Sequence, residues 1–205
     1  MTTPIRSTPA ALTGTVFAVV LTVANGDGGA LSTPQHIAAA AALTLLIPFA
    51  VYVGAVLRAC AVTSTDTWAA TTAVAAGTVG ACLKLASDAP EIAKTGPGIS
   101  ATGPSPAVLT ALADATTILA LFPLALFGLA AGIAALRTGA LPAWLGIGAL
   151  AAGGALALNG CLLHTENVPA MLMLALWCLL TSIHLLRAGR RGQVGAAPAG
   201  VTSAV

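Results

Sequence analysis

Long apolar stretches, separated by short polar connections, fill most of this chain. A helix that crosses a bilayer needs roughly 20 mainly apolar residues, and it pairs its own backbone polar groups, as hydrocarbon requires. Six stretches come close to this length. The pattern therefore predicts six transmembrane helices, over residues 9–25, 36–58, 67–87, 114–136, 142–162 and 168–187.

Composition agrees with a chain solvated by lipid. Hydrophobic residues make up 58% and charged residues 7%, with a mean hydropathy of +0.96, whereas soluble domains carry roughly a quarter charged residues. We predict one all-α transmembrane bundle over 1–188 and a disordered cytoplasmic tail over 189–205. The bilayer is the expected partner. A net charge of +2 and 4% aromatic residues offer no basic surface for nucleic acid.

The distribution of basic residues predicts the orientation. Lys and Arg are retained on the cytoplasmic side of a membrane. Both termini are therefore predicted to be cytoplasmic, and the Ala, Gly and Arg usage, typical of a GC-rich bacterial genome, suggests the bacterial plasma (inner) membrane. Trp68 and Trp144 begin their spans on that side, where indole rings are preferred. Six of the eight Lys and Arg residues lie in alternate connections or in the tails: Arg6, Arg58, Arg137, Arg187, Arg190 and Arg191.

The first span has a second interpretation. Arg6 followed by an apolar run to Ala24 also resembles a signal peptide, with Thr22 and Ala24 as the small residues before a cleavage site. Cleavage would leave five spans and an external N-terminus.

Ionisable residues near hydrocarbon are the candidates for chemistry. Lys84 and Asp88 are four residues apart and can pair on one helix face, and Asp114 enters the next span at the same depth. His164 and Glu166 lie at the same outer end. We predict a polar binding cluster of these five residues; the ordinary alternative is that Lys84 extends to the interface and the acids are solvated. No catalytic motif is present in the sequence.

Metal binding and disulfide formation were considered at the same end. Cys161 and His36 would add ligands of the type that zinc and copper accept, but the spacing matches no closed metal motif. We therefore predict no metal and no cofactor. Cys82 and Cys161 both approach the oxidising face and can be bridged in principle, whereas Cys60 and Cys178 are expected to be free thiols.

Small residues and prolines predict how the helices pack. Gly128 and Gly132 form a G-x-x-x-G pattern, which lets two helix backbones approach closely. Tight packing within one bundle is the expected use, and homodimerisation is the alternative. Pro48 and Pro123 each remove a backbone donor within a span and should kink their helices.

One hairpin resembles a known group. The run from Leu121 to Gly132 is followed by Leu136-Arg-Thr-Gly-Ala-Leu-Pro-Ala-Trp-Leu-Gly146. It resembles the fourth-to-fifth-span hairpin of uncharacterised six-span actinobacterial membrane proteins, where an Arg-Thr-Gly turn leads into Leu-Pro-x-Trp-Leu-Gly. The resemblance implies a six-span topology and no activity. This chain has Ala143 where the group commonly has Arg.

These observations favour an integral membrane protein without catalysis of its own, acting as a structural, accessory or binding component. Possible partners are a second copy of the chain or another membrane protein. One alternative is a small-solute or ion transporter, which would need a water-filled cavity beside Pro48 and Pro123. The other is a membrane enzyme with an outer-face site, which would need Asp114 and His164 to converge.

Overall fold

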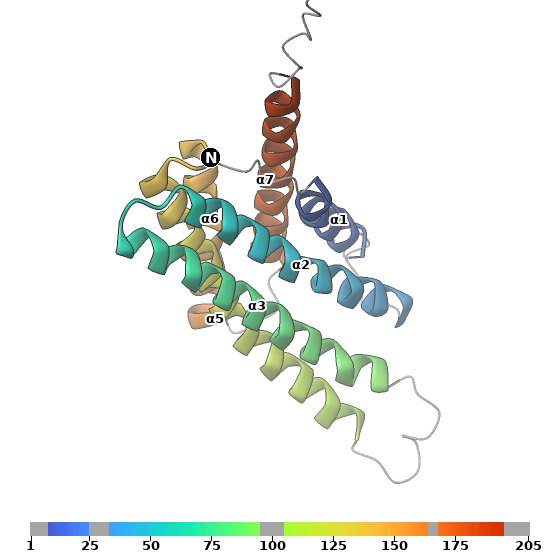
Figure 1. Ribbon diagram of the computed structural model, residues 1–205. Helices are drawn as coiled ribbons and strands as arrows, with labels where there is room; N and C mark the ends of the chain where they lie inside the picture. The colour runs from blue at the N-terminus through green and yellow to red at the C-terminus, as the bar shows by residue number, and fades with distance from the viewer. Residues whose placement is uncertain (1–7, 25–32, 95–104, 164–167, 195–205) are drawn as a thin grey trace, which may run out of the picture.

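The computed structural model describes residues 8–24, 33–94, 105–163 and 168–194, and nearly all of them are helical (Figure 1). Among them, five helices are long and apolar enough to cross a membrane, and α1 is a shorter apolar helix of 17 residues. The chain is therefore an all-α, multi-pass membrane protein. The helices are α1 (Thr8–Ala24), α2 (Thr33–Ala59), α3 (Ser64–Ala93), α5 (Pro106–Thr138), α6 (Ala143–Leu158) and α7 (Val168–Val194). The π-helical turn η1 (Asn159–Leu163) continues α6.

The helices close into a ring. Along the ring, α1 packs on α2, α2 on α3, α3 on α5, α5 on α6, α6 on α7, and α7 returns to α1. In Figure 1, α2, α3 and α5 form a row of long antiparallel helices, and α6, α7 and α1 lie along its other side. The α3–α5 pair has the most extensive contact, and the α6–α7 pair has the sparsest contact of these neighbours. The ring is therefore most loosely joined between α6 and α7.

Helices α3, α5 and α7 each extend at least six residues beyond one end of the predicted span. The predicted end of the third span at residue 87 is wrong, because α3 continues through Pro90 to Ala93. Opposite it, α5 begins at Pro106, where a first-turn proline loses no helical hydrogen bond. The two extensions stabilise each other, since Lys94 Nζ donates to Thr110 Oγ1 across them. Helix α7 runs seven residues past 187, so part of the tail predicted as disordered is helical, and residues 195–205 lie outside the described residues.

An aromatic cluster joins four helices at the centre of the ring. Trp177 of α7 is 3% exposed, and its indole Nε1 donates a hydrogen bond of 2.9 Å to the carbonyl oxygen of Leu145 on α6. The rings of Phe49 on α2 and Phe127 on α5 meet it edge to face, with centroids 6.1 and 5.6 Å away. Such pairs add to the stabilisation that burial gives, and the indole donor is satisfied.

The G-x-x-x-G pattern is used inside the bundle, as predicted. A Cβ atom at Gly128 would lie 2.9 Å from the Ala149 carbonyl oxygen and 2.9 Å from Gly153 Cα, and one at Gly132 would lie 2.8 Å from the Gly146 carbonyl oxygen. The backbones of α5 and α6 can approach this closely because neither glycine carries a side chain. The face is occupied by α6, which argues against the alternative use in a homodimer.

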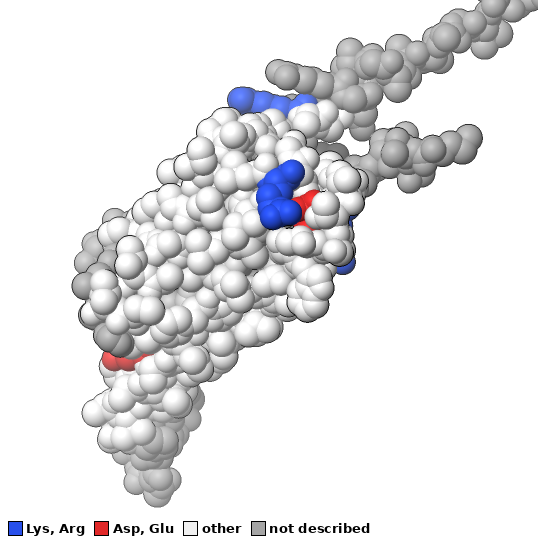
Figure 2. Space-filling model, turned by 90° about the vertical axis from the view of Figure 1, so that its left-hand side faces the viewer, with Lys and Arg blue, Asp and Glu red and all other residues white. Residues whose placement is uncertain are grey.

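The surface carries few charges between the two ends of the bundle. Figure 2 shows basic side chains toward the upper end of this face, with an acidic patch beside them, further acidic side chains near the lower left, and a broad band without either between them. The upper end is also where α2 turns into α3 and α5 into α6 (Figure 1). Trp68 and Trp144, which lie near the starts of α3 and α6 there, are 74% and 55% exposed. This arrangement is typical of a protein whose middle faces lipid.

Candidate functional site

Polar side chains connect three helices at the lower end of the bundle. Asp88 Oδ1 on α3 lies 3.9 Å from Lys84 Nζ on the same helix and 3.8 Å from His36 Nδ1 on α2. Lys84 Nζ also donates a hydrogen bond of 3.1 Å to Thr117 Oγ1 on α5. We refer to His36, Lys84, Asp88 and Thr117 as the polar network. The Lys84–Thr117 contact has hydrogen-bond length, whereas the contacts of Asp88 with Lys84 and His36 given above are longer.

The polar network is largely shielded from solvent. The Asp88 side chain is 7% exposed, and those of Lys84 and His36 are each 16% exposed. Neighbouring opposite charges stabilise each other most where water is excluded, and removing one of them leaves an uncompensated buried charge. The network therefore holds α2, α3 and α5 in one arrangement at this end.

The structure brings two of the five predicted site residues together. Lys84 and Asp88 meet, as their spacing indicates. Asp114 does not join them: its side chain is exposed, and it forms no ion pair with the described residues. The reason is its register on α5, because Asp114 follows the buried Ala113 by one residue and is rotated by about 100° from the buried face. His164 and Glu166 lie outside the described residues.

Sequence reasoning missed the roles of His36 and Thr117. From the sequence, His36 is a candidate only for metal binding, and Thr117 belongs to no predicted site. Thr117 lies four residues after the buried Ala113 and is 4% exposed, so it belongs to the buried face of α5. A polar residue on a buried face was the available signal. Nothing in the sequence indicates which helix that face meets.

A second polar contact lies at the opposite end of the α3–α5 pair. Arg137 Nε donates to Asp66 Oδ1 at 2.7 Å, and the Asp66 side chain is 6% exposed. Asp66 also completes a capping box, because its backbone N–H donates to Thr63 Oγ1 and the Thr63 N–H donates to its Oδ2. The Asp66 carboxylate therefore caps the N-terminus of α3 and also joins this end of α3 to the C-terminal end of α5.

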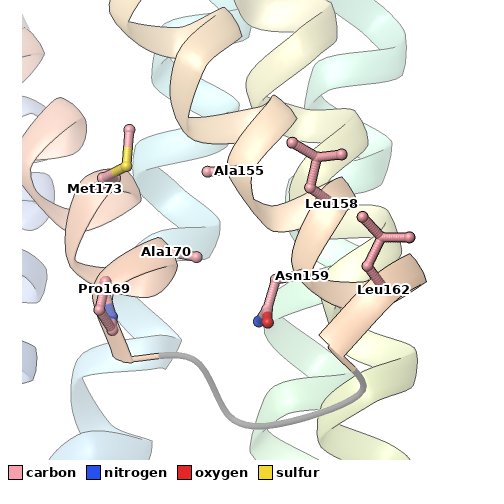
Figure 3. Close-up of a pocket in the computed structure, with 7 residues that line it drawn as sticks. All are labelled: Ala155, Leu158, Asn159, Leu162, Pro169, Ala170 and Met173. Atoms are coloured by element: carbon pink, nitrogen blue, oxygen red, sulfur yellow. The ribbon is translucent and has the colours of Figure 1, made fainter.

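An apolar groove lies between α6 and α7 (Figure 3). Its volume is about 300 Å³. In Figure 3, Asn159 and Pro169 lie toward its lower end, with Ala155 and Met173 above them. Asn159 is the polar member of the lining and is 2% exposed. The groove is lined by Ala155, Leu158, Asn159, Leu162, Pro169, Ala170 and Met173.

Cysteines and potential metal ligands do not gather in the described part of the chain. All four cysteines are free, so the bridge considered between Cys82 and Cys161 is not formed; both are exposed. Cys60 and Cys178 are also free thiols. Over residues 8–24, 33–94, 105–163 and 168–194, no three His, Cys, Asp or Glu side chains are grouped closely enough to hold a metal ion.

No protein-family model, curated protein or solved structure matches this chain. The resemblance of the 121–146 hairpin to six-span actinobacterial proteins stays a prediction. Function must therefore be inferred from the packing and the polar contacts of the chain itself.

Proposed function

We propose that this protein is a non-catalytic component of the bacterial plasma (inner) membrane that acts as a structural or binding partner within the bilayer. In this proposal α1 also crosses the membrane and both termini are cytoplasmic. The basic side chains near the upper end of the bundle support this orientation.

One observation supports a structural role above the alternatives: α3 and α5 are joined at both ends. The Lys84–Thr117 contact joins them at one end and Asp66–Arg137 at the other. Between these contacts, Gly77 and Gly80 of α3 lie against Phe127 and Leu124 of α5. Alternating access requires one group of helices to move against another around a central site, and such motion within this pair would break these part-buried polar contacts.

The two alternatives have different standing. Asp88 is buried, and Lys84 and His36 are partly buried beside it. Such ionisable groups are functional candidates by default in a membrane protein, and this favours a transporter as the second candidate. The enzyme alternative is weakened, because Asp114 is exposed and faces away from the polar network. The groove between α6 and α7 does not include Pro48 or Pro123 among its lining residues.

Cysteine accessibility in membranes tests the proposal. In a background without the four native cysteines, Ala50→Cys places a thiol on α2 two residues after Pro48, at a position that is 0% exposed. We expect no modification by a membrane-impermeant maleimide from either side. Labelling after denaturation in SDS is the control that the thiol is present and reactive. Rapid modification of the folded protein would reveal a water-filled path and favour the transporter.

Two exposed positions test the orientation in the same assay. Val62→Cys lies in the turn between α2 and α3, and Ser105→Cys lies just before α5. We expect Val62→Cys to react only in inside-out vesicles and Ser105→Cys only in intact spheroplasts. The reverse pattern would contradict cytoplasmic termini.

A further inference from the structure

We infer that the groove between α6 and α7 is a binding site for one acyl chain of a membrane diacyl lipid, with Asn159 hydrogen-bonded to the ester carbonyl at the head of that chain. The inference deepens the proposed binding role, since it names a ligand class for this protein. It requires that α6 and α7 span the bilayer, and it holds whether or not the protein is a transporter.

The position of the groove in the membrane determines what can fill it. Both of its walls are helices long and apolar enough to cross a bilayer. Leu158, Leu162 and Met173 are 62%, 70% and 42% exposed, so its rim carries large apolar side chains that face outward. An open groove of this kind in a spanning surface faces hydrocarbon. A lipid chain is therefore the occupant that the surroundings supply.

The depth of Asn159 agrees with the level of an ester carbonyl. Asn159 is 16 residues beyond Ala143, the first residue of α6, which corresponds to about 24 Å along the helix. The hydrocarbon core is about 30 Å thick, so a helix that begins near one boundary brings Asn159 close to the other. Ester groups lie at that boundary, and the amide of Asn159 can donate to a carbonyl oxygen.

The size and the lining of the groove fit one chain. Its volume of about 300 Å³ is at the lower end of the range for small-molecule sites, which are typically apolar with a few placed polar groups. Ala155 and Ala170 provide small walls where longer side chains would fill the space. The polar Asn159 lies at one end and apolar residues continue above it (Figure 3), which matches a molecule with a polar head and an apolar tail.

Local backbone features keep this seam of the ring open. The π-helical turn η1 continues α6 along the groove, and such turns are frequent at functional sites. Pro169 lies near the start of the opposite wall. The contact between α6 and α7 is the sparsest between neighbours in the ring. A lipid chain would complete the packing there.

Specific occupancy must come from shape and from Asn159, because a chain gains no hydrophobic free energy on moving from lipid into an apolar groove. We therefore expect Asn159→Leu, which keeps a similar volume, to reduce occupancy by about fivefold, as for the loss of one ordinary hydrogen bond. Ala155→Phe should reduce occupancy further, because it fills the groove. Ala151→Phe is the matched control: it lies one turn earlier on α6, is exposed, and is not among the lining residues.

Photocrosslinking tests the inference. The full chain is reconstituted into vesicles of phosphatidylethanolamine and phosphatidylglycerol that contain a phosphatidylglycerol with a diazirine in its acyl chain. After illumination, crosslinked peptides are identified by mass spectrometry. We expect crosslinks concentrated at Ala155, Ala170 and Met173 in the native chain and in Ala151→Phe, and depleted in Asn159→Leu and Ala155→Phe.

Several results would overturn the inference. Crosslinks spread evenly around the lipid-facing surface would show an ordinary annular shell, and equal yields in Ala155→Phe and Ala151→Phe would place the chain elsewhere. Crosslinking of α6 to a second copy of the protein by a photoreactive residue at 155 would assign the groove to an oligomer contact. If Ala50→Cys reacts with maleimide while the native chain still gives the expected crosslinks, a water path exists and the proposed function fails, but the lipid site is retained.

Discussion

Replacing Gly128 by alanine tests the close contact between α5 and α6. The new Cβ atom would lie 2.9 Å from the Ala149 carbonyl oxygen, 2.9 Å from Gly153 Cα and 3.0 Å from Gly153 N. All three are backbone atoms, which cannot rotate away as a side chain can. The two helices would have to separate by several tenths of an ångström along this contact.

The magnitude follows from two opposing effects. Alanine is favoured over glycine within a helix by about 1 kcal/mol, whereas overpacking a close contact typically costs about 1–3 kcal/mol. Gly154→Ala provides the matched control, since it changes the same atoms one residue after Gly153 and its Cβ atom meets nothing within 4 Å. The propensity gain is common to both variants, so their difference in unfolding free energy isolates the packing effect.

Equilibrium unfolding in mixed detergent micelles, followed by tryptophan fluorescence, measures this difference. We expect Gly128→Ala to be less stable than Gly154→Ala by about 1–3 kcal/mol, independent of protein concentration. Equal stability of the two variants would refute the close approach of α5 and α6. A loss that grows on dilution would instead assign Gly128 to a contact between two copies.

Two further predictions concern polar contacts between helices. Arg137→Gln leaves the Asp66 carboxylate without its 2.7 Å partner. Because the Arg137 side chain is 49% exposed, water compensates part of the loss, and we expect unfolding in detergent to show a destabilisation of about 1 kcal/mol. Unchanged stability would refute a stabilising role for the Asp66–Arg137 contact. Trp177→Phe removes the donor to the Leu145 carbonyl oxygen and should lower the unfolding free energy by about 1–3 kcal/mol, because one hydrogen bond and part of a buried ring are lost. Retention of native stability would show that the contact contributes nothing.

The candidate site illustrates where prediction from sequence succeeds. Lys84 and Asp88 are four residues apart on one helix, and their contact follows from helix geometry alone. His36 and Thr117 come from two other helices, and Thr117 is 33 residues from the lysine that donates to it. Contacts at such separations depend on which helix faces meet. The exposure of Asp114 has the same origin, because it lies one residue away from the buried face of α5.

The ends of α3 and α5 show a related effect. Pro90 and the polar residues before it are ordinary signals for a helix end, yet α3 continues through them. The extension lies against the first turns of α5, where Lys94 and Thr110 are hydrogen-bonded. A local signal for termination was outweighed by contacts with a helix that begins more than ten residues later.

The sequence by itself determined that this is a helical membrane protein, because long apolar stretches in lipid must satisfy their backbone groups internally and helices do so within each stretch. It also indicated that Gly128 and Gly132 serve close packing. Only the tertiary structure decided the order of helices in the ring, the assembly of the polar network, and the groove at the α6–α7 seam. Lipid solvates every apolar face equally well, so the hydropathy pattern does not specify which faces meet; that choice depends on side-chain shape and on polar contacts between helices distant in the chain.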